Sequence, residues 1–216
     1  LKRAHPESPR FGSMVPLPGS LRALSIDTMH MPGADVEVSI YQPDTTRYFE
    51  FTDVTALAEG FSIDSSSMQD KFLFSNNLEL VLKDHAMPVP NSYYKAHTSK
   101  ITLGTRDKRL TIHDPLLYPK ESRYELASKL DWQSSVMRLE GKALRFRNVN
   151  FPALLNKQEI RIGKTFVDSL NILAYKDKRV PLDSSDRKPD FYDLLNVDEP
   201  YFYLDTVVMN NGYVLY

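Results

Sequence analysis

The chain contains no cysteine among its 216 residues. This absence excludes disulfide bonds, cysteine nucleophiles and every zinc site that uses sulfur ligands. Glycine is also scarce, because 8 residues are about half of the usual ~7% share. Neither G-x-G-x-x-G nor G-x-x-x-x-G-K-[ST] occurs in the sequence. A glycine-rich loop that holds a nucleotide phosphate is therefore not expected.

Charge of one sign is not in excess, and no long apolar run is present. The 27 Lys and Arg residues stand against 28 Asp and Glu residues, which gives a formal net charge of −1. A polyanion would therefore have to bind at a local patch, because the whole molecule does not attract it. No segment approaches the ~20 apolar residues that cross a bilayer, and the first residues lack the apolar core of a signal peptide. We expect a soluble protein without a membrane span, whose location the sequence leaves unknown.

The first 22 residues differ from the rest of the chain. They contain four of the 14 prolines and show no apolar periodicity, so regular structure is not expected there. Their basic residues outnumber their single Glu. We interpret residues 1–22 as an extended N-terminal arm and residues 23–216 as one β-rich domain. The alternative for the arm is an untethered tail.

Apolar and polar residues alternate with a period of two through most of the domain, which is typical of half-buried strands. About nine short strands separated by Pro, Asn and Asp turns favour a mainly β fold, an antiparallel β-sandwich or jelly-roll. One short helix is expected within residues 121–136, with Ser122 as its cap, and brief helical turns at 53–61 and 190–195. The strands are predicted at 36–40, 47–52, 78–82, 101–103, 110–112, 141–149, 158–167, 169–175, 201–208 and 212–216.

The last residues predict a hairpin at the C-terminus. Asn210-Asn211-Gly212 is a strong turn signal, because Asn and Gly both tolerate positive φ. We expect Tyr213–Tyr216 to pair antiparallel with Tyr203–Met209. The final strand carries no lysine or proline that would block a further strand, so we expect another part of the chain or a partner subunit to cover it.

No constellation of residues points to catalysis. None of the five histidines lies two or four residues from another, and no G-x-S-x-G motif occurs. We therefore assign no catalytic residue, no cofactor and no metal ligand. One alternative is a jelly-roll enzyme with a dispersed site, in which His97 or His113 meets a carboxylate only in the folded chain.

Arg145 and Arg147 lie in the densest basic run and share one face of their predicted strand, while Leu144 and Phe146 take the other. We take the two arginines as anion-binding candidates for a local contact with nucleic acid or a sulfated glycan. No aromatic residue alternates with them on the polar face of this strand, which argues against a platform for base stacking. An ordinary solvated sheet face is the alternative.

Tyrosine is abundant near the C-terminus, and it suits interfaces because it combines apolar area with a polar tip. The leading hypothesis is a non-enzymatic structural protein, a β-rich subunit that assembles with itself or with partner subunits into a larger particle such as a viral capsid or phage virion. A second hypothesis is a β-sandwich that binds carbohydrate through exposed tyrosines. The interface candidates are Tyr201, Tyr203, Tyr213, Val214 and Tyr216.

Overall fold

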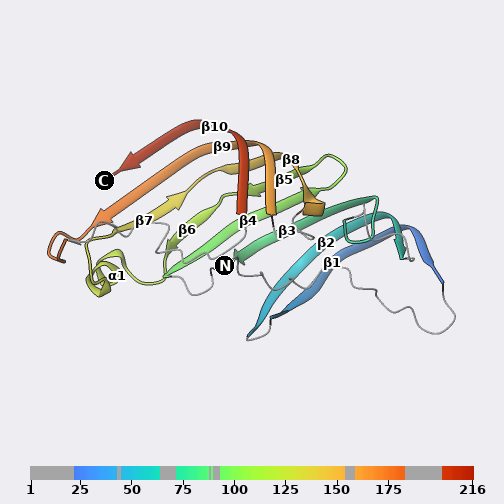
Figure 1. Ribbon diagram of the computed structural model, residues 1–216, viewed down its shortest axis with the longest axis horizontal. Helices are drawn as coiled ribbons and strands as arrows, with labels where there is room; N and C mark the ends of the chain where they lie inside the picture. Colours follow the sequence, from blue (N-terminus) through green and yellow to red (C-terminus); the bar gives the residue numbers. More distant parts are fainter. Residues whose placement is uncertain are drawn as a thin grey trace, which may run out of the picture.

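The computed structural model of the chain is mainly β and antiparallel, as the sequence predicts, and the short helix expected within residues 121–136 is present (Figure 1). The ten strands of its described part hydrogen-bond into a single continuous sheet, whereas a sandwich or jelly-roll was expected from the sequence. The structure describes residues 22–42, 45–63, 72–87, 89, 93–153, 159–182 and 201–216. The proposed arm at 1–22 lies almost entirely outside these residues, as does the expected helical turn at 190–195.

The strands differ widely in length, and the longest lie at or beside the two edges of the sheet. No helix in the described part of the chain is long and apolar enough to cross a membrane. In chain order the elements are β1 (Leu24–Gln42), β2 (Thr45–Ile63), β3 (Asn77–Met87), β4 (Tyr94–Gly104), β5 (Arg109–His113), β6 (Leu116–Pro119), α1 (Arg123–Lys129), β7 (Ser135–Glu140), β8 (Ala143–Val149), β9 (Glu159–Lys176) and β10 (Tyr201–Leu215).

The first five strands follow one another as an antiparallel meander, and β4 pairs with β5 along one half and with β6 along the other. In the same way, β9 pairs with β8 along one half and with β7 along the other. Backbone hydrogen bonds from Asp114 to Lys142 and from Gly141 to Pro115 continue the ladder across the breaks between these short strands. The sheet is therefore unbroken from β1 to β10.

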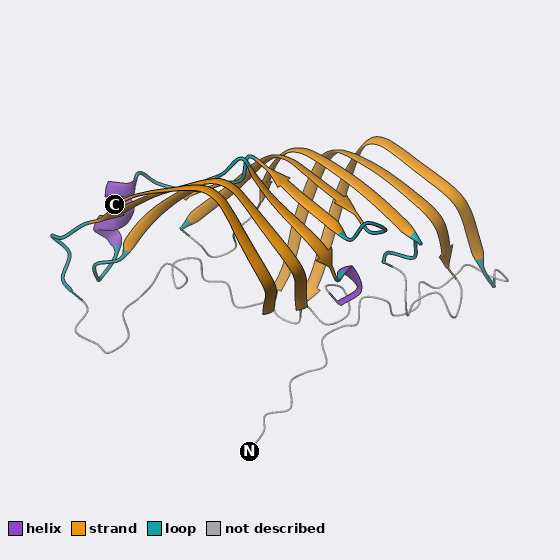
Figure 2. Ribbon diagram, turned by 90° about the horizontal axis from the view of Figure 1, so that it is seen from above, coloured by secondary structure: helices purple, strands orange, loops and turns teal. Residues whose placement is uncertain are grey.

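A line of residues with positive φ crosses the sheet and bends it into the arch seen in Figure 2. It includes Asp84 in β3, Asp114 after β5, Ser169 in β9 and Asn211 in β10. Asp and Asn tolerate this left-handed backbone better than other residues with a side chain, and such irregular positions bend strands. Because these positive-φ residues lie at the same level across the paired strands, the strands bend together and keep their pairing.

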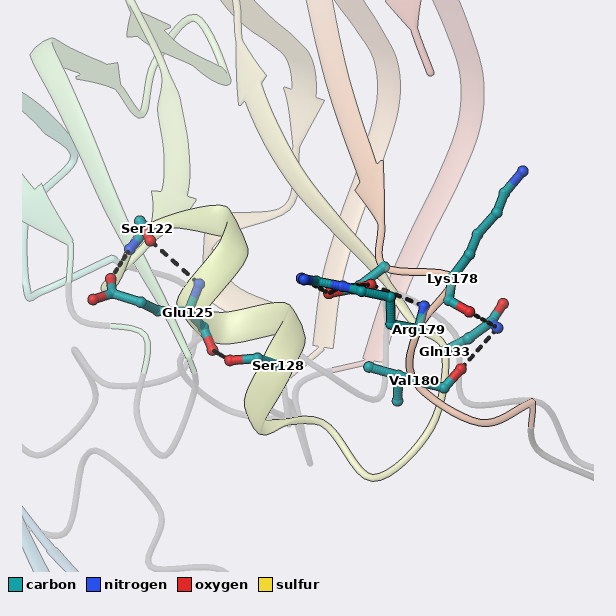
Figure 3. A network of polar contacts seen from close by, with 8 residues as sticks. Ser122, Glu125, Ser128, Gln133, Lys178, Arg179 and Val180 are labelled. Carbon is teal, nitrogen blue, oxygen red and sulfur yellow. Dashed lines mark hydrogen bonds and ion pairs between the residues drawn. The ribbon is translucent and has the colours of Figure 1, made fainter.

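Helix α1 forms a small core with one end of the sheet. Buried Leu126 and Ala127 pack on Tyr94 and Val136. The helix begins with a reciprocal capping box, in which the Glu125 backbone N–H donates to the Ser122 hydroxyl and the Ser122 backbone N–H donates to the Glu125 carboxylate (Figure 3). The predicted cap is thus confirmed.

The helix is shorter than residues 121–136 allowed. It ends at Lys129, and β7 begins at Ser135. The residues from Ser135 onward form a strand instead of continuing the helix, because pairing with β9 buries Val136 against the helix. The loop after β9 is tied to the same region, since the Gln133 side chain donates to the carbonyls of Lys178 and Val180 (Figure 3).

A second core lies at the other end of the arch. Val149, Phe151 and Ile162 are buried there, with Leu103, Leu110 and Phe146 among the partly buried residues around them. The hairpin predicted from 101–103 and 110–112 is confirmed, because Leu103 is opposite Leu110 and Ile101 is opposite Ile112.

Three local predictions are wrong. Residues 53–61 are part of β2 rather than a helical turn, because their alternate residues Val54, Ala56 and Ala58 are buried on the sheet. The separate strands at 158–167 and 169–175 are one strand, β9, which bends at Ser169 instead of turning back. The C-terminal hairpin is the third error. Residues 201–215 form the single strand β10, parallel to β9, and Asn211 bends this strand without reversing it.

Candidate functional site

β10 forms one edge of the sheet, and within the described residues it pairs only with β9 (Figure 1). In a parallel pair, about half of the backbone N–H and C=O groups of an edge strand point away from its neighbour. At about 3.3 Å a residue, the 15 residues of β10 present an edge roughly 50 Å long. The described residues leave this long strand-pairing surface open.

The side chains of β10 are also exposed, although many are apolar. Every described residue from Tyr203 to Tyr216 is exposed, and the value reaches 65% for Val214 and 76% for Tyr216. Four of the five interface candidates, Tyr203, Tyr213, Val214 and Tyr216, are therefore at the surface; Tyr201 belongs to β10, but its side chain lies outside the described part. Sequence reasoning missed the other exposed apolar residues of this edge, Leu204, Val207, Val208, Met209 and Leu215.

The opposite edge, β1, carries features that discourage further strand pairing. It contains Pro32 and three acidic residues, and its register with β2 shifts twice near Ala34. Proline, charged side chains and bulges are the usual protections of an edge strand. In β10, by contrast, Asp205 is the only charged residue, proline and lysine are absent, and the bend at Asn211 is the only positive φ.

A second surface surrounds Arg145 and Arg147, the predicted anion-binding residues. Both guanidinium groups lie over the ring of Phe166 in β9, at 5.7 Å and 5.1 Å from its centre. The two arginines thus share one face of β8, as predicted, while Phe146 joins the core on the other. Arg145 also pairs with Asp168 at 2.7 Å. An aromatic ring from the neighbouring strand therefore does accompany these arginines. Nothing in the sequence indicated this ring beside them, because Phe166 belongs to a different strand.

Arg147 lies at the centre of a row of three cations. It is directly opposite Arg109 in β5 and directly opposite Lys164 in β9. Arg109 reaches Asp107 only at 4.0 Å. Among the described residues, Arg147 and Lys164 have no ion pair. Sequence reasoning missed Arg109, because register alone places it opposite Arg147.

Arg161 extends this surface toward the edge strand. Its guanidinium lies 4.9 Å from the centre of the Tyr203 ring in β10. Arg161 and Lys164 are both exposed, while Ile162 and Thr165 are buried. The strand pair is irregular here, because Asn148, which lies against Gly163 from the neighbouring strand, has a positive φ. We call Arg109, Arg145, Arg147, Arg161 and Lys164, with the rings of Phe166 and Tyr203, the basic face.

Of the two histidines named for the enzyme alternative, His97 meets a carboxylate in the described part of the chain. His97 Nε2 lies 3.0 Å from Asp84 Oδ1, and both side chains are exposed. The nearby Ser99 hydroxyl donates to Asp114 instead of to a histidine ring. The backbone carbonyl of His113 accepts hydrogen bonds from the hydroxyl groups of Thr98 and Ser99. No group of three or more possible metal ligands occurs in the part of the chain that the structure describes.

Neither of two surface cavities involves the exposed tyrosines at the C-terminal edge of the sheet, which the carbohydrate alternative would use. One cavity of about 340 Å³ lies beside α1 and includes Arg123, Arg138 and Tyr175 in its lining. The other, of about 680 Å³, lies around Asn148 and Phe151. Tyr203, Tyr213 and Tyr216 line neither of them. These exposed tyrosines follow a sheet edge, which suits contact with another chain better than enclosure of a sugar.

Comparison of the chain with protein-family models, with curated proteins and with solved structures found no match. No function is therefore transferred to it from a relative. Function must instead be inferred from the chemistry of two surfaces, the edge of β10 and the basic face.

Proposed function

We propose that the protein is a non-enzymatic structural subunit whose copies associate through the outer edge of β10. The observation that supports this most strongly is the combination of length, exposure and low charge in this strand. An unprotected apolar edge of this length is a template for strand addition. Leaving it in water would expose both unpaired backbone groups and apolar side chains.

A second copy of β10 is the partner that fits this edge best. Two identical strands can pair antiparallel about a two-fold axis, which places the same apolar residues on both sides. With one Asp205 in each strand, an antiparallel pairing centred near Val208 keeps the two carboxylates apart. Pairing of β10 with β1 of another copy is disfavoured by Pro32 and by the acidic residues of β1.

The surface available on β10 is adequate for a stable dimer. A fully exposed aromatic side chain contributes about 200 Å², and an aliphatic one somewhat less, so the exposed apolar residues of β10 present roughly 800 Å². Specific interfaces bury about 800 Å² on each partner. The dimer would therefore use most of this edge.

A two-fold contact closes on itself, so a larger particle requires a second surface. The dimer is then the building unit of any capsid or virion that this protein forms.

Val214→Lys tests the edge directly. Val214 would be buried once in each subunit, and losing two partly buried valines costs about 2 kcal/mol, or roughly 30-fold in the dissociation constant. Light scattering coupled to size exclusion should give about 50 kDa or more for the parent, twice the 24.8 kDa of the chain, and a shift toward the single chain for the variant.

Leu182→Lys is the matched control, because Leu182 is 69% exposed and lies outside the strands. It should leave the mass unchanged. A parent protein that runs as a single chain at all concentrations would refute the proposal. So would a Val214→Lys variant that associates as strongly as the parent.

A further inference from the structure

The row of Arg109, Arg147 and Lys164 is unfavourable for the isolated fold. Like charges directly opposite on neighbouring strands destabilise a sheet. Neighbouring strands are about 4.8 Å apart, so the three cations lie within roughly 10 Å across the sheet. Within the described residues, the ion pair of Arg109 with Asp107, at 4.0 Å, is the only one that these three cations make. A ligand with several negative charges would turn this repulsion into attraction.

The shape of the basic face favours an extended ligand over a small one. Its residues come from β5, β8, β9 and β10 and belong to the lining of neither cavity. The cations form a band across an open sheet instead of converging on one point. A chain of phosphates can follow such a band, whereas a single phosphate ion would contact only part of it.

The aromatic rings narrow the choice among polyanions. Phe166 lies beneath Arg145 and Arg147, and Tyr203 lies beneath Arg161. Bases stack on aromatic rings and on guanidinium planes, whereas the sugar rings of a sulfated glycan have no π-face that could stack on a guanidinium. A paired duplex hides its base faces, so an unpaired strand makes fuller use of this surface.

We propose that the basic face binds single-stranded nucleic acid. Arg109, Arg147 and Lys164 contact the phosphates, and bases stack at the Phe166 and Tyr203 positions. This binding does not depend on self-association through β10, because all five cations and Phe166 lie on other strands. The contact is independent of base sequence, since phosphates and ring faces are common to every nucleotide.

The strength of the phosphate contacts can be estimated from their salt dependence. Each contact to a single strand contributes about 0.7 to the slope of log affinity against log salt. Replacing Arg147 and Lys164 by Gln should lower that slope by about 1.4, which corresponds to roughly tenfold weaker binding near 0.15 M salt. The difference should shrink as the salt concentration approaches 1 M.

Fluorescence anisotropy with a labelled oligothymidylate provides the measurement. The probe should exceed the about 4–16 nucleotides of a typical binding site. The full chain should bind with affinity that falls steeply with salt, and Arg147→Gln/Lys164→Gln should bind about tenfold more weakly. The matched control is Lys120→Gln/Lys178→Gln, which removes the same charge from exposed positions off this face. Absence of binding by the parent, or equal losses in both double variants, would overturn the proposal.

Phe166→Leu distinguishes nucleic acid from other polyanions. Loss of one stacked base should weaken oligothymidylate binding at least fivefold, since stacking contributes about 1–3 kcal/mol per base. Binding of a heparin fragment should not change. If Phe166→Leu leaves oligonucleotide affinity intact, or lowers both affinities equally, the face is not a nucleic-acid site. Should this variant melt at a lower temperature, Tyr203→Leu makes the same comparison from an exposed position.

Discussion

Tyr94→Phe probes how helix α1 is anchored to the sheet. Tyr94 is fully buried, and its hydroxyl accepts a hydrogen bond of 3.0 Å from the backbone N–H of Met137. That N–H has no partner in β6, because β6 pairs with β7 only at Leu139 and Glu140. Removing the hydroxyl leaves a buried donor unpaired, which costs about 1–3 kcal/mol. We expect a loss of about 2 kcal/mol in the free energy of unfolding.

This loss corresponds to a melting temperature about 4–8 °C lower in a chain of this size. Urea unfolding followed by circular dichroism measures it, and Tyr93→Phe is the control because Tyr93 is 50% exposed. Burial also raises the pKa of the Tyr94 phenol above its ordinary value of about 10. Above that pH the phenol ionises in the unfolded chain before it ionises in the folded one, so the contribution of neutral Tyr94 to the free energy of unfolding should be lost as the pH rises further. Equal stabilities of Tyr94→Phe and Tyr93→Phe at neutral pH would refute the reasoning.

Two further predictions concern the bend and the loop after β9. Ser169 has a φ of 55°, so Ser169→Gly should stabilise the protein by about 0.5–1 kcal/mol, while Ser169→Val should destabilise it by at least about 1 kcal/mol. Denaturant titration measures both free energies of unfolding. Equal destabilisation by the two variants would contradict the role of positive φ in the bend. Hydrogen bonds from the side chain and then the backbone of Arg179 lower the pKa of Asp177 to about 2 from its ordinary 3.8. The stability this pair provides is present above pH 3.8 and is lost as the pH falls through about 2. Asp177→Asn should therefore flatten the acid limb of the stability curve, and an unchanged limb would argue against the pair.

Local patterns in the sequence predicted much of the secondary structure. The hairpin at 101–103 and 110–112 and the cap at Ser122 were found correctly, because a polar turn and a capping side chain act within a few residues. The same approach failed at Asn211 and Ser169. A residue suited to positive φ can end a strand or only bend it, and which occurs depends on the strand beside it.

For the two candidate surfaces too, the sequence predicted what depends on neighbouring residues but not the contacts between strands. Sequence alternation placed Arg145 and Arg147 on one face, and it marked Tyr213, Val214 and Tyr216 as unprotected. It could not indicate that Phe166 lies beneath the two arginines, since that contact depends on the pairing of β8 with β9.

By itself, the sequence determined the β class, the alternation of faces, the helix start and the low charge of the C-terminal strand. These properties depend on each residue and its near neighbours in the chain. Only the tertiary structure decided that β10 is a parallel edge strand and that Arg109, Arg147 and Lys164 lie in one row. Strand order and register are set by pairing between segments far apart in the chain, and a period of two is compatible with many such pairings.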